Sequence, residues 1–125
     1  MNKVGKGKRL EKLFREKIKE WFPTSLTELK PTLRFMSKDF WGVFDGLTFF
    51  PNKKKFLFWQ TKSNKLAAKE RKIFWASAKK FRTLSTQVVL IEKHNSGFCV
   101  SSDLAPIVYI EDQQIKKFLT SILNH

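Results

Sequence analysis

The chain has 125 residues, enough for one compact domain but not for two. Hydrophobic residues make up 42% of it, with 13 Phe and 4 Trp, which excludes a chain that is disordered throughout. The formal charge of +14 predicts a polyanionic partner, with nucleic acid ahead of an anionic membrane surface.

The N-terminal third predicts one helix followed by a loop. Apolar residues at helical spacing predict an amphipathic helix over 9–22 that ends before Pro23. Residues 1–8 precede it as a mobile basic tail, so the domain is expected to span 9–125. Residues 23–39 carry two prolines and predict a loop, in which 25–29 allow a short helical turn.

The middle of the chain predicts a β-hairpin. Two aromatic runs, 40–50 and 56–61, flank a turn over 51–55 with the sequence PNKKK. The second run is apolar at nearly every position, as in a central strand with both faces covered.

The C-terminal half alternates helix and strand signals. Helical spacing returns over 65–84, with Ile73 among the residues expected to face inward, and closes the chain over 112–123 with Asp112 as the expected N-cap. Apolar runs predict strands over 87–91, 97–101 and 107–110. We therefore expect an α/β (α+β) fold with a mixed central β-sheet flanked by helices.

The hairpin places three polar side chains together. With the turn centred near residue 53, Asp45 and Gln60 lie almost directly opposite, with Cβ atoms roughly 5 Å apart. Lys62 lies two positions beyond Gln60 and so shares that face. Burying a carboxylate, an amide and an ammonium among Phe, Leu and Trp would be costly without a purpose.

Phosphodiester hydrolysis uses these groups. An oxygen-lined site holds Mg²⁺ or Mn²⁺, which activates water and offsets the charge on the phosphate. A lysine beside the metal can orient the water or stabilise the transition state. The hairpin thus predicts a metal site for cleavage of nucleic acid.

The runs 42–46 and 58–62 resemble the D…(E/D)-x-K signature of the PD-(D/E)XK nuclease superfamily. The helix opening GKGKRLEKLF and the loop 34–39 are similar to the archaeal Holliday junction resolvase branch. The resemblance covers 5 to about 92 and matches the helix–hairpin–helix–strand order. It implies a restriction-endonuclease-like core and a metal-dependent endonuclease acting on DNA, branched DNA above all.

The resemblance also implies roles for individual residues. Asp45 matches the principal metal ligand, Gln60 and Glu11 are secondary ligands, and the backbone carbonyl of Thr61 is an additional one. Lys62 matches the catalytic lysine. Gln60 stands where the family usually has an acid, and the lost negative charge should weaken binding of Mg²⁺.

Basic and polar residues of the tail, the loop, the hairpin turn and the helix predicted over 65–84 are expected to contact phosphates. They are Lys6, Lys8, Arg9, Ser37, Lys38, Lys53, Lys54, Lys55, Lys65, Lys69 and Lys72. Ser37 matches the serine of the family's loop. Such lysines can also be solubility charges. Trp41, Trp59 and Trp75 are expected in the core rather than as stacking platforms for bases.

Simpler interpretations stand beside these. Asp45 precedes a glycine, as in an ordinary turn, and Glu11 can be a surface acid paired with Arg15. Lys62 can be one more solvated lysine. Asp39 competes with Asp45, but its position before the strand suggests a cap or a supporting role.

Two alternatives to the nuclease remain open: a DNA-binding protein that has lost catalysis on the same fold, and a basic RNA- or ribosome-associated protein without a site. The resemblance implies a homodimer, for which 104–110 and the apolar residues of 112–123 would either form the interface or complete the core. Because Cys99 is the only cysteine, no internal disulfide can form, and we expect a reducing, cytoplasmic location without a secretory signal or membrane span.

Overall fold

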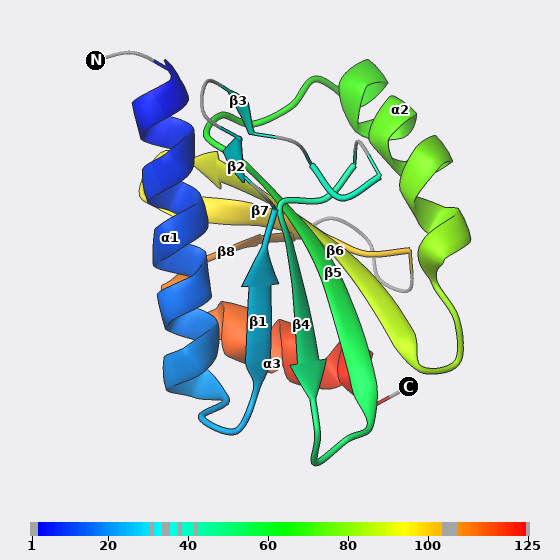
Figure 1. Cartoon of the computed structure of the whole chain (residues 1–125). Helices are drawn as coiled ribbons and strands as arrows, with labels where there is room; N and C mark the ends of the chain where they lie inside the picture. The colour runs from blue at the N-terminus through cyan, green and yellow to red at the C-terminus, as the bar shows by residue number, and fades with distance from the viewer. Residues whose placement is uncertain are drawn as a thin grey trace.

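A six-stranded mixed β-sheet forms the centre of the protein, and helices flank it (Figure 1). The computed structural model describes residues 3–30, 32–33, 36–37, 39–41, 43–103 and 108–124, without the side chains of 3–8, 32–33, 36–37 and 112. In chain order the elements are α1 (Lys3–Trp21), β1 (Leu26–Leu29), β2 (Thr32–Leu33), β3 (Met36–Ser37), β4 (Gly46–Phe50), β5 (Lys55–Lys62), α2 (Ala68–Ala78), the 3-10 helix η1 (Lys79–Phe81), β6 (Thr86–His94), β7 (Gly97–Ser101), β8 (Val108–Ile110) and α3 (Asp112–Leu123). The predicted mixed sheet with flanking helices is confirmed.

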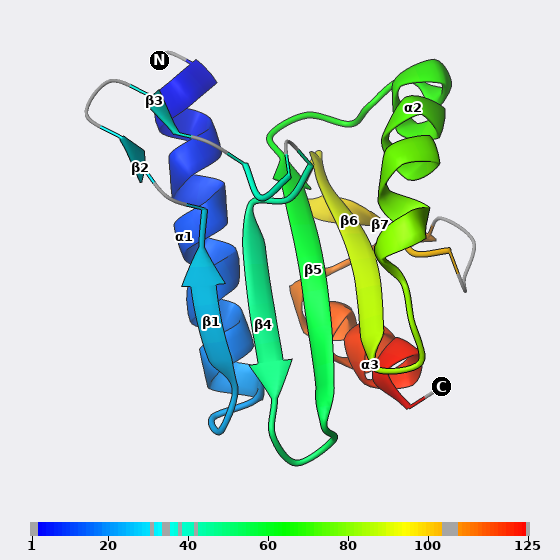
Figure 2. The same ribbon diagram turned by 45° about the vertical axis from the view of Figure 1, so that its right-hand side comes forward.

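The sheet combines two antiparallel parts through one parallel pair. Its strand order is β1-β4-β5-β6-β7-β8, and only β5 and β6 run parallel. Parallel neighbours need a crossover connection, which α2 and η1 provide. A separate two-stranded sheet, β2–β3, lies beside the N-terminal end of α1 (Figure 2).

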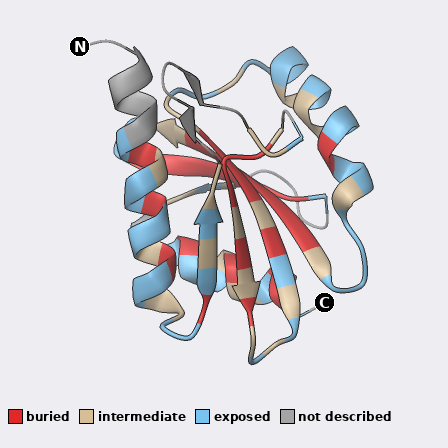
Figure 3. Ribbon diagram, viewed as in Figure 1, coloured by how far each residue is buried: buried red, intermediate tan, exposed pale blue. Residues whose placement is uncertain are grey.

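The helices cover the two faces of the sheet. Phe14 and Ile18 of α1 and Leu119 of α3 pack on one face, around Trp59 of β5. On the other face Ala78 of α2 belongs to a second, smaller core that contains the aromatic rings around β4 and β5. Figure 3 shows the buried residues gathered along the central strands between these layers.

Strand β5 is the central strand that the sequence predicted. It pairs with β4 on one edge and with β6 on the other, and its Leu57 and Trp59 are fully buried. The predicted register is also confirmed within the strands, because Gly46 pairs with Trp59, and the same register continued by one residue would place Asp45 opposite Gln60. The open end of the hairpin therefore carries Asp45 and Gln60, and the turn lies at the other end.

Some predicted elements were wrong or misplaced. The segment 25–29 contains strand β1 instead of a helical turn, because it pairs antiparallel with β4 over its whole length. The strand predicted over 40–50 begins only at Gly46, since Phe40 bridges back to Phe44 and closes a turn. Helix α1 begins at Lys3, ahead of the predicted start at residue 9.

The second half of the chain follows the prediction closely, with local differences. The helix predicted over 65–84 is shorter, α2 with η1, and its Ile73 is 61% exposed, so that residue does not face inward as expected. Helix α3 has the predicted bounds, but its N-cap is Glu111, whose backbone N–H donates to Gln114 Oε1 at 3.0 Å, and not Asp112. Cys99 is a free, buried thiol, as expected.

The apolar C-terminal residues complete the core. Ile115, Leu119, Ile122 and Leu123 are all at most 1% exposed and belong to the core of the α1 face. Of the two uses that the sequence left open for them, the structure thus supports core packing, while 104–107 lie outside the described residues. No helix in the described part of the chain is long and apolar enough to cross a membrane.

A buried ion pair fixes α2 to the sheet. Glu92 of β6 is fully buried, and its Oε1 accepts hydrogen bonds from Arg71 Nη2 at 2.8 Å and from the Leu66 N–H at 2.7 Å. Its Oε2 accepts a third from Arg71 Nε at 2.9 Å. These bonds hold α2 and the loop after Lys62 in place.

Replacing Arg71 with Met should leave the Glu92 carboxylate buried without its cation. Breaking a buried pair costs about 3 kcal/mol of unfolding free energy, which lowers Tm by roughly 10 °C in a chain of this size. Lys72→Met, which removes an exposed lysine from the same helix, is the matched control and should change Tm little. Equal Tm values for the two variants in thermal circular dichroism would contradict this role.

Gly46 gives the Trp59 indole its space. A Cβ at position 46 would overlap Cζ2 of Trp59, far inside van der Waals contact. The Asp-Gly sequence also suggested a simple turn, but Gly46 is the first residue of β4, and the lack of a side chain there makes room for Trp59.

Gly46→Ala should therefore destabilise the protein by about 2 kcal/mol, because overpacking forces a buried side chain or the backbone to shift. The double variant Gly46→Ala/Trp59→Phe should recover part of that loss in urea unfolding. A single variant as stable as the wild type would show that the contact is not restrictive.

Candidate functional site

Four charged residues converge at the open end of the hairpin. The ammonium of Lys30, just after β1, lies 2.8 Å from Glu11 Oε1, 2.9 Å from Asp45 Oδ1 and 3.2 Å from Asp39 Oδ1. The three carboxylates come from α1, from the segment before the Phe40 turn and from the residue before β4. These residues are separated in the sequence, and the sheet topology brings them together.

Asp45 is the most firmly held member. It is 2% exposed, and its Oδ2 accepts hydrogen bonds from the Thr61 N–H and the Thr61 hydroxyl, both at 2.9 Å. Its backbone N–H donates to the Trp59 carbonyl, and its own carbonyl accepts from the Lys30 N–H. Asp45 therefore joins β1, the start of β4 and the end of β5.

The expected meeting of Asp45 with Gln60 has a different geometry. The register of β4 and β5 ends at the Gly46–Trp59 pair, and Asp45 lies in a bend just before it, where the side-chain alternation of a strand no longer holds. Its carboxylate turns to Thr61, and no hydrogen bond joins it to Gln60 among the described residues. Thr61 was expected to contribute its carbonyl, whereas here its N–H and hydroxyl hold Asp45.

Gln60 and Lys62 share a face, as predicted, and line a pocket of about 350 Å³ between the sheet and α2. The other lining residues are Asp39, Val43, Leu66, Glu70, Ile73, Phe74 and Ser77. Gln60 is 5% exposed, and its Oε1 is buried without a hydrogen-bond partner among the described residues. An unpaired buried acceptor costs about 1–3 kcal/mol, so a bound group that satisfies it would be favoured.

Burial and neighbouring charges shift two pKa values in the cluster. Burial would lower the pKa of Lys30, but its bonds to Glu11 and Asp45 outweigh that effect and raise the pKa well above its ordinary value. The pKa of Glu11 is raised, first by burial and further by the Asp45 charge, against the opposing hydrogen bond from Lys30. The Lys30 side chain therefore stays positively charged at neutral pH.

The oxygen donors suit a hard divalent cation. Asp45 and Glu11 offer carboxylates, and Gln60 offers an amide oxygen that lacks a partner. Among the described residues, no group of three or more His, Cys, Asp or Glu is arranged to hold a metal ion, since the carboxylates point at Lys30. Gln60 lines the pocket on the α2 side, whereas the Asp45 carboxylate turns to Thr61 and Lys30, so these oxygens are not arranged around a common point.

Glu11 is not the exposed acid of the simpler interpretation. Its side chain is 14% exposed, and it pairs with Lys30. The resemblance implied a place for Glu11 beside Asp45, and the structure brings the two residues to the same cation. Lys30 was missed, because it lay in a segment predicted as loop and no motif surrounds it.

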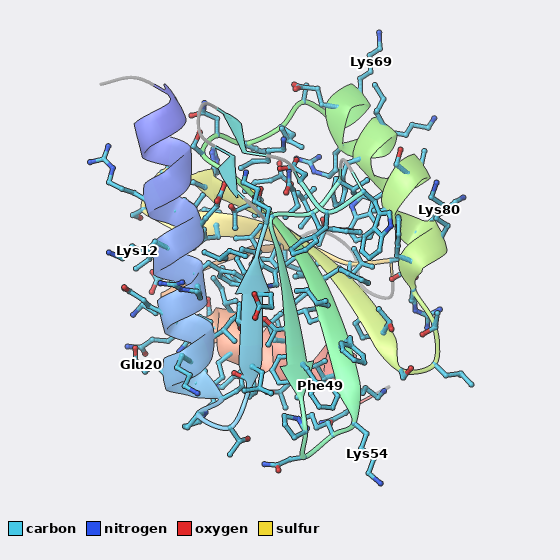
Figure 4. All side chains as sticks on the ribbon, viewed as in Figure 1. Lys12, Glu20, Phe49, Lys54, Lys69 and Lys80 are labelled. Atoms are coloured by element: carbon cyan, nitrogen blue, oxygen red, sulfur yellow. The ribbon has the colours of Figure 1, made fainter. Side chains whose placement is uncertain are left out.

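The predicted basic contacts fall into separate regions. Lys65, Lys69 and Lys72 are exposed on or just before α2, and Lys69 points away from the sheet (Figure 4). Lys53, Lys54 and Lys55 lie at the hairpin turn, where Lys53 binds Asn124 Oδ1 at 2.7 Å. Because Gln60 lies five residues beyond Lys55 along β5, this turn is roughly 17 Å from the site. The structure therefore does not bring the turn lysines to the site.

Arg9 is exposed on α1, two residues before Glu11. The side chains of Lys6, Lys8, Ser37 and Lys38, which were also predicted to bind nucleic acid, lie outside the described residues.

Trp41 is exposed, contrary to expectation. It is 66% exposed and has a φ of 51°, a backbone conformation that bulky residues rarely adopt. Its ring packs against Phe58 at 5.5 Å and Phe81 at 5.4 Å between ring centroids. Trp59 is in the core as predicted. Trp41 therefore presents a supported aromatic surface on the segment between Asp39 and Asp45.

No protein-family model, no curated protein and no solved structure matches the chain.

Proposed function

We propose that the protein is a metal-dependent endonuclease that hydrolyses phosphodiester bonds in DNA, with a site of the PD-(D/E)XK type. The observation that carries the proposal is the convergence of Glu11 and Asp45, at 2.8 and 2.9 Å from one ammonium, beside the Gln60–Thr61–Lys62 segment of β5. This is the set of residues on which the resemblance rests. The succession of α1, the antiparallel strands β1, β4 and β5, then α2 and a parallel β6 supports the restriction-endonuclease-like core.

Each residue has a role in this proposal. Asp45, Glu11, the Gln60 amide oxygen and the Thr61 carbonyl would hold Mg²⁺ or Mn²⁺. When bound, the metal supplies a polarised water and offsets the charge of the scissile phosphate. Lys62 faces the pocket beside Gln60, where its ammonium can orient that water or neutralise the developing charge.

The substrate would be gripped by phosphate contacts around the site. Lys65, Lys69 and Lys72 are exposed on the α2 side and supply sequence-independent attraction. We propose branched DNA as the preferred substrate, because base stacking is interrupted at a branch point, where a terminal base could stack on the exposed Trp41.

A DNA-binding protein without catalysis is the second candidate. The observation in its favour is that Lys30 already pairs with Glu11 and Asp45, while Gln60 replaces an acid. It shares every phosphate contact with the nuclease and differs only in lacking cleavage. A basic RNA-associated protein is the third, and it would not need Asp45.

Asp45→Asn should reduce cleavage of labelled four-way junctions in Mg²⁺ or Mn²⁺ by on the order of 100-fold, because metal-ligand charge contributes several kcal/mol to transition-state stabilisation. The measurement is a time course on junction, duplex and single-stranded DNA and on structured RNA. Glu20→Gln, at the far end of α1 from Glu11, changes the net charge equally and should cut like the wild type (Figure 4).

Binding of DNA without cutting by all three proteins would reject the nuclease and support the binding protein. Cleavage that Asp45→Asn leaves intact would reject this site. Preference for structured RNA, unchanged in Asp45→Asn, would support the RNA-associated protein.

Trp41→Ala should weaken binding to junctions and single strands about tenfold, since stacking of one base on an aromatic ring contributes about 1–3 kcal/mol. Duplex binding should change little, and Trp41→Phe should keep most of the affinity. Leu84→Ala removes another exposed apolar side chain, 96% exposed, and is the control. Equal affinities of Trp41→Ala and wild type in fluorescence anisotropy would show that Trp41 contacts no base.

A further inference from the structure

Lys30 is a nearly buried cation held by three acids. Its side chain is 13% exposed, and its ammonium lies 2.8–3.2 Å from Glu11, Asp39 and Asp45. Its backbone N–H is fixed by the Asp45 carbonyl at 2.8 Å. Both ends of this residue are therefore bound to the acidic cluster.

The cluster needs a cation to form. Three carboxylates that share one region repel one another, and burial makes each charged form less favourable. The ammonium offsets both effects, because it lies 2.8–3.2 Å from a carboxylate oxygen of each of the three acids. Lys30 therefore stabilises the arrangement of Glu11 and Asp45 when no other cation is bound.

The same oxygen atoms are those that a metal would need. Asp45 Oδ2 already accepts two hydrogen bonds from Thr61, which leaves Oδ1 as the oxygen for a cation, and Lys30 lies 2.9 Å from it. Mg²⁺ binds oxygen at about 2.0–2.1 Å. Two cations on one oxygen atom repel each other strongly in a site with little solvent.

We propose that Lys30 is the resident cation of this site and competes with the divalent cation for Glu11 and Asp45. Its flexible four-carbon stem lets the ammonium leave the carboxylates when the metal binds. Lys30 thereby sets the metal concentration at which the site fills. The inference rests on the proposed function only for the identity of the competing ion, and metal binding is measured without DNA.

The test is calorimetric titration of Mn²⁺ into the full chain, with wild type, Lys30→Met and Lys30→Arg side by side. Lys30→Met removes the competing charge and should bind Mn²⁺ on the order of tenfold more tightly or better. Lys30→Arg keeps the charge and should stay near the wild-type affinity. Adding Asp45→Asn to Lys30→Met should abolish the gain, which assigns it to this cluster.

Lys30→Met that binds Mn²⁺ no more tightly than the wild type would overturn the proposal. If Lys30→Met does not fold without metal, melting curves with and without Mn²⁺ decide. Recovery of a cooperative transition in Mn²⁺ supports competition, and no recovery overturns it.

DNA cleavage is assayed separately and answers a different question. Tighter Mn²⁺ binding by Lys30→Met with no cleavage by any variant would uphold the role of Lys30 and reject the nuclease. Cleavage by the wild type, together with an unchanged metal affinity in Lys30→Met, would support the nuclease and reject the role of Lys30.

Discussion

Strand β5 is the constraint on which the rest of the structure depends. It is paired on both edges and packed on both faces, so its apolar residues have no freedom of register. Its carboxyl end, where the sequence turns polar at Gln60, lies beside the end of β1 and the start of β4. Glu11 reaches this corner from α1. The site is thus formed where several elements are fixed by the burial of their neighbours.

Patterns of neighbouring residues in the sequence predicted the elements that form from neighbouring residues, such as the hairpin. Aromatic runs around a turn identified the hairpin, and counting outward from that turn gave the register of Asp45 and Gln60. Strand β1 could not be predicted in this way, because its four residues become a strand only by pairing with β4. Lys30 was missed for the same reason, since its position follows from that pairing.

The chemistry of the site was harder to predict than its position. If the strand continued through residue 45, the alternation of side chains would place Asp45 on the face of Gln60. Asp45 instead lies in a bend, and its carboxylate turns to Thr61. The position of the turn lysines, in contrast, was predictable. Residues at the open end of a hairpin are necessarily remote from its turn, so Lys54 and Asp45 cannot lie together.

Gly46 packs against Trp59 in the core, and the residue directly before it, Asp45, belongs to the site. Any side chain at position 46 would collide with the indole, which itself packs on Phe14 of α1. In evolution these two positions should therefore change together, with a larger residue at 46 accepted only where 59 is smaller. Asp45 can then be kept or lost by selection on function, while the glycine beside it is retained for packing alone.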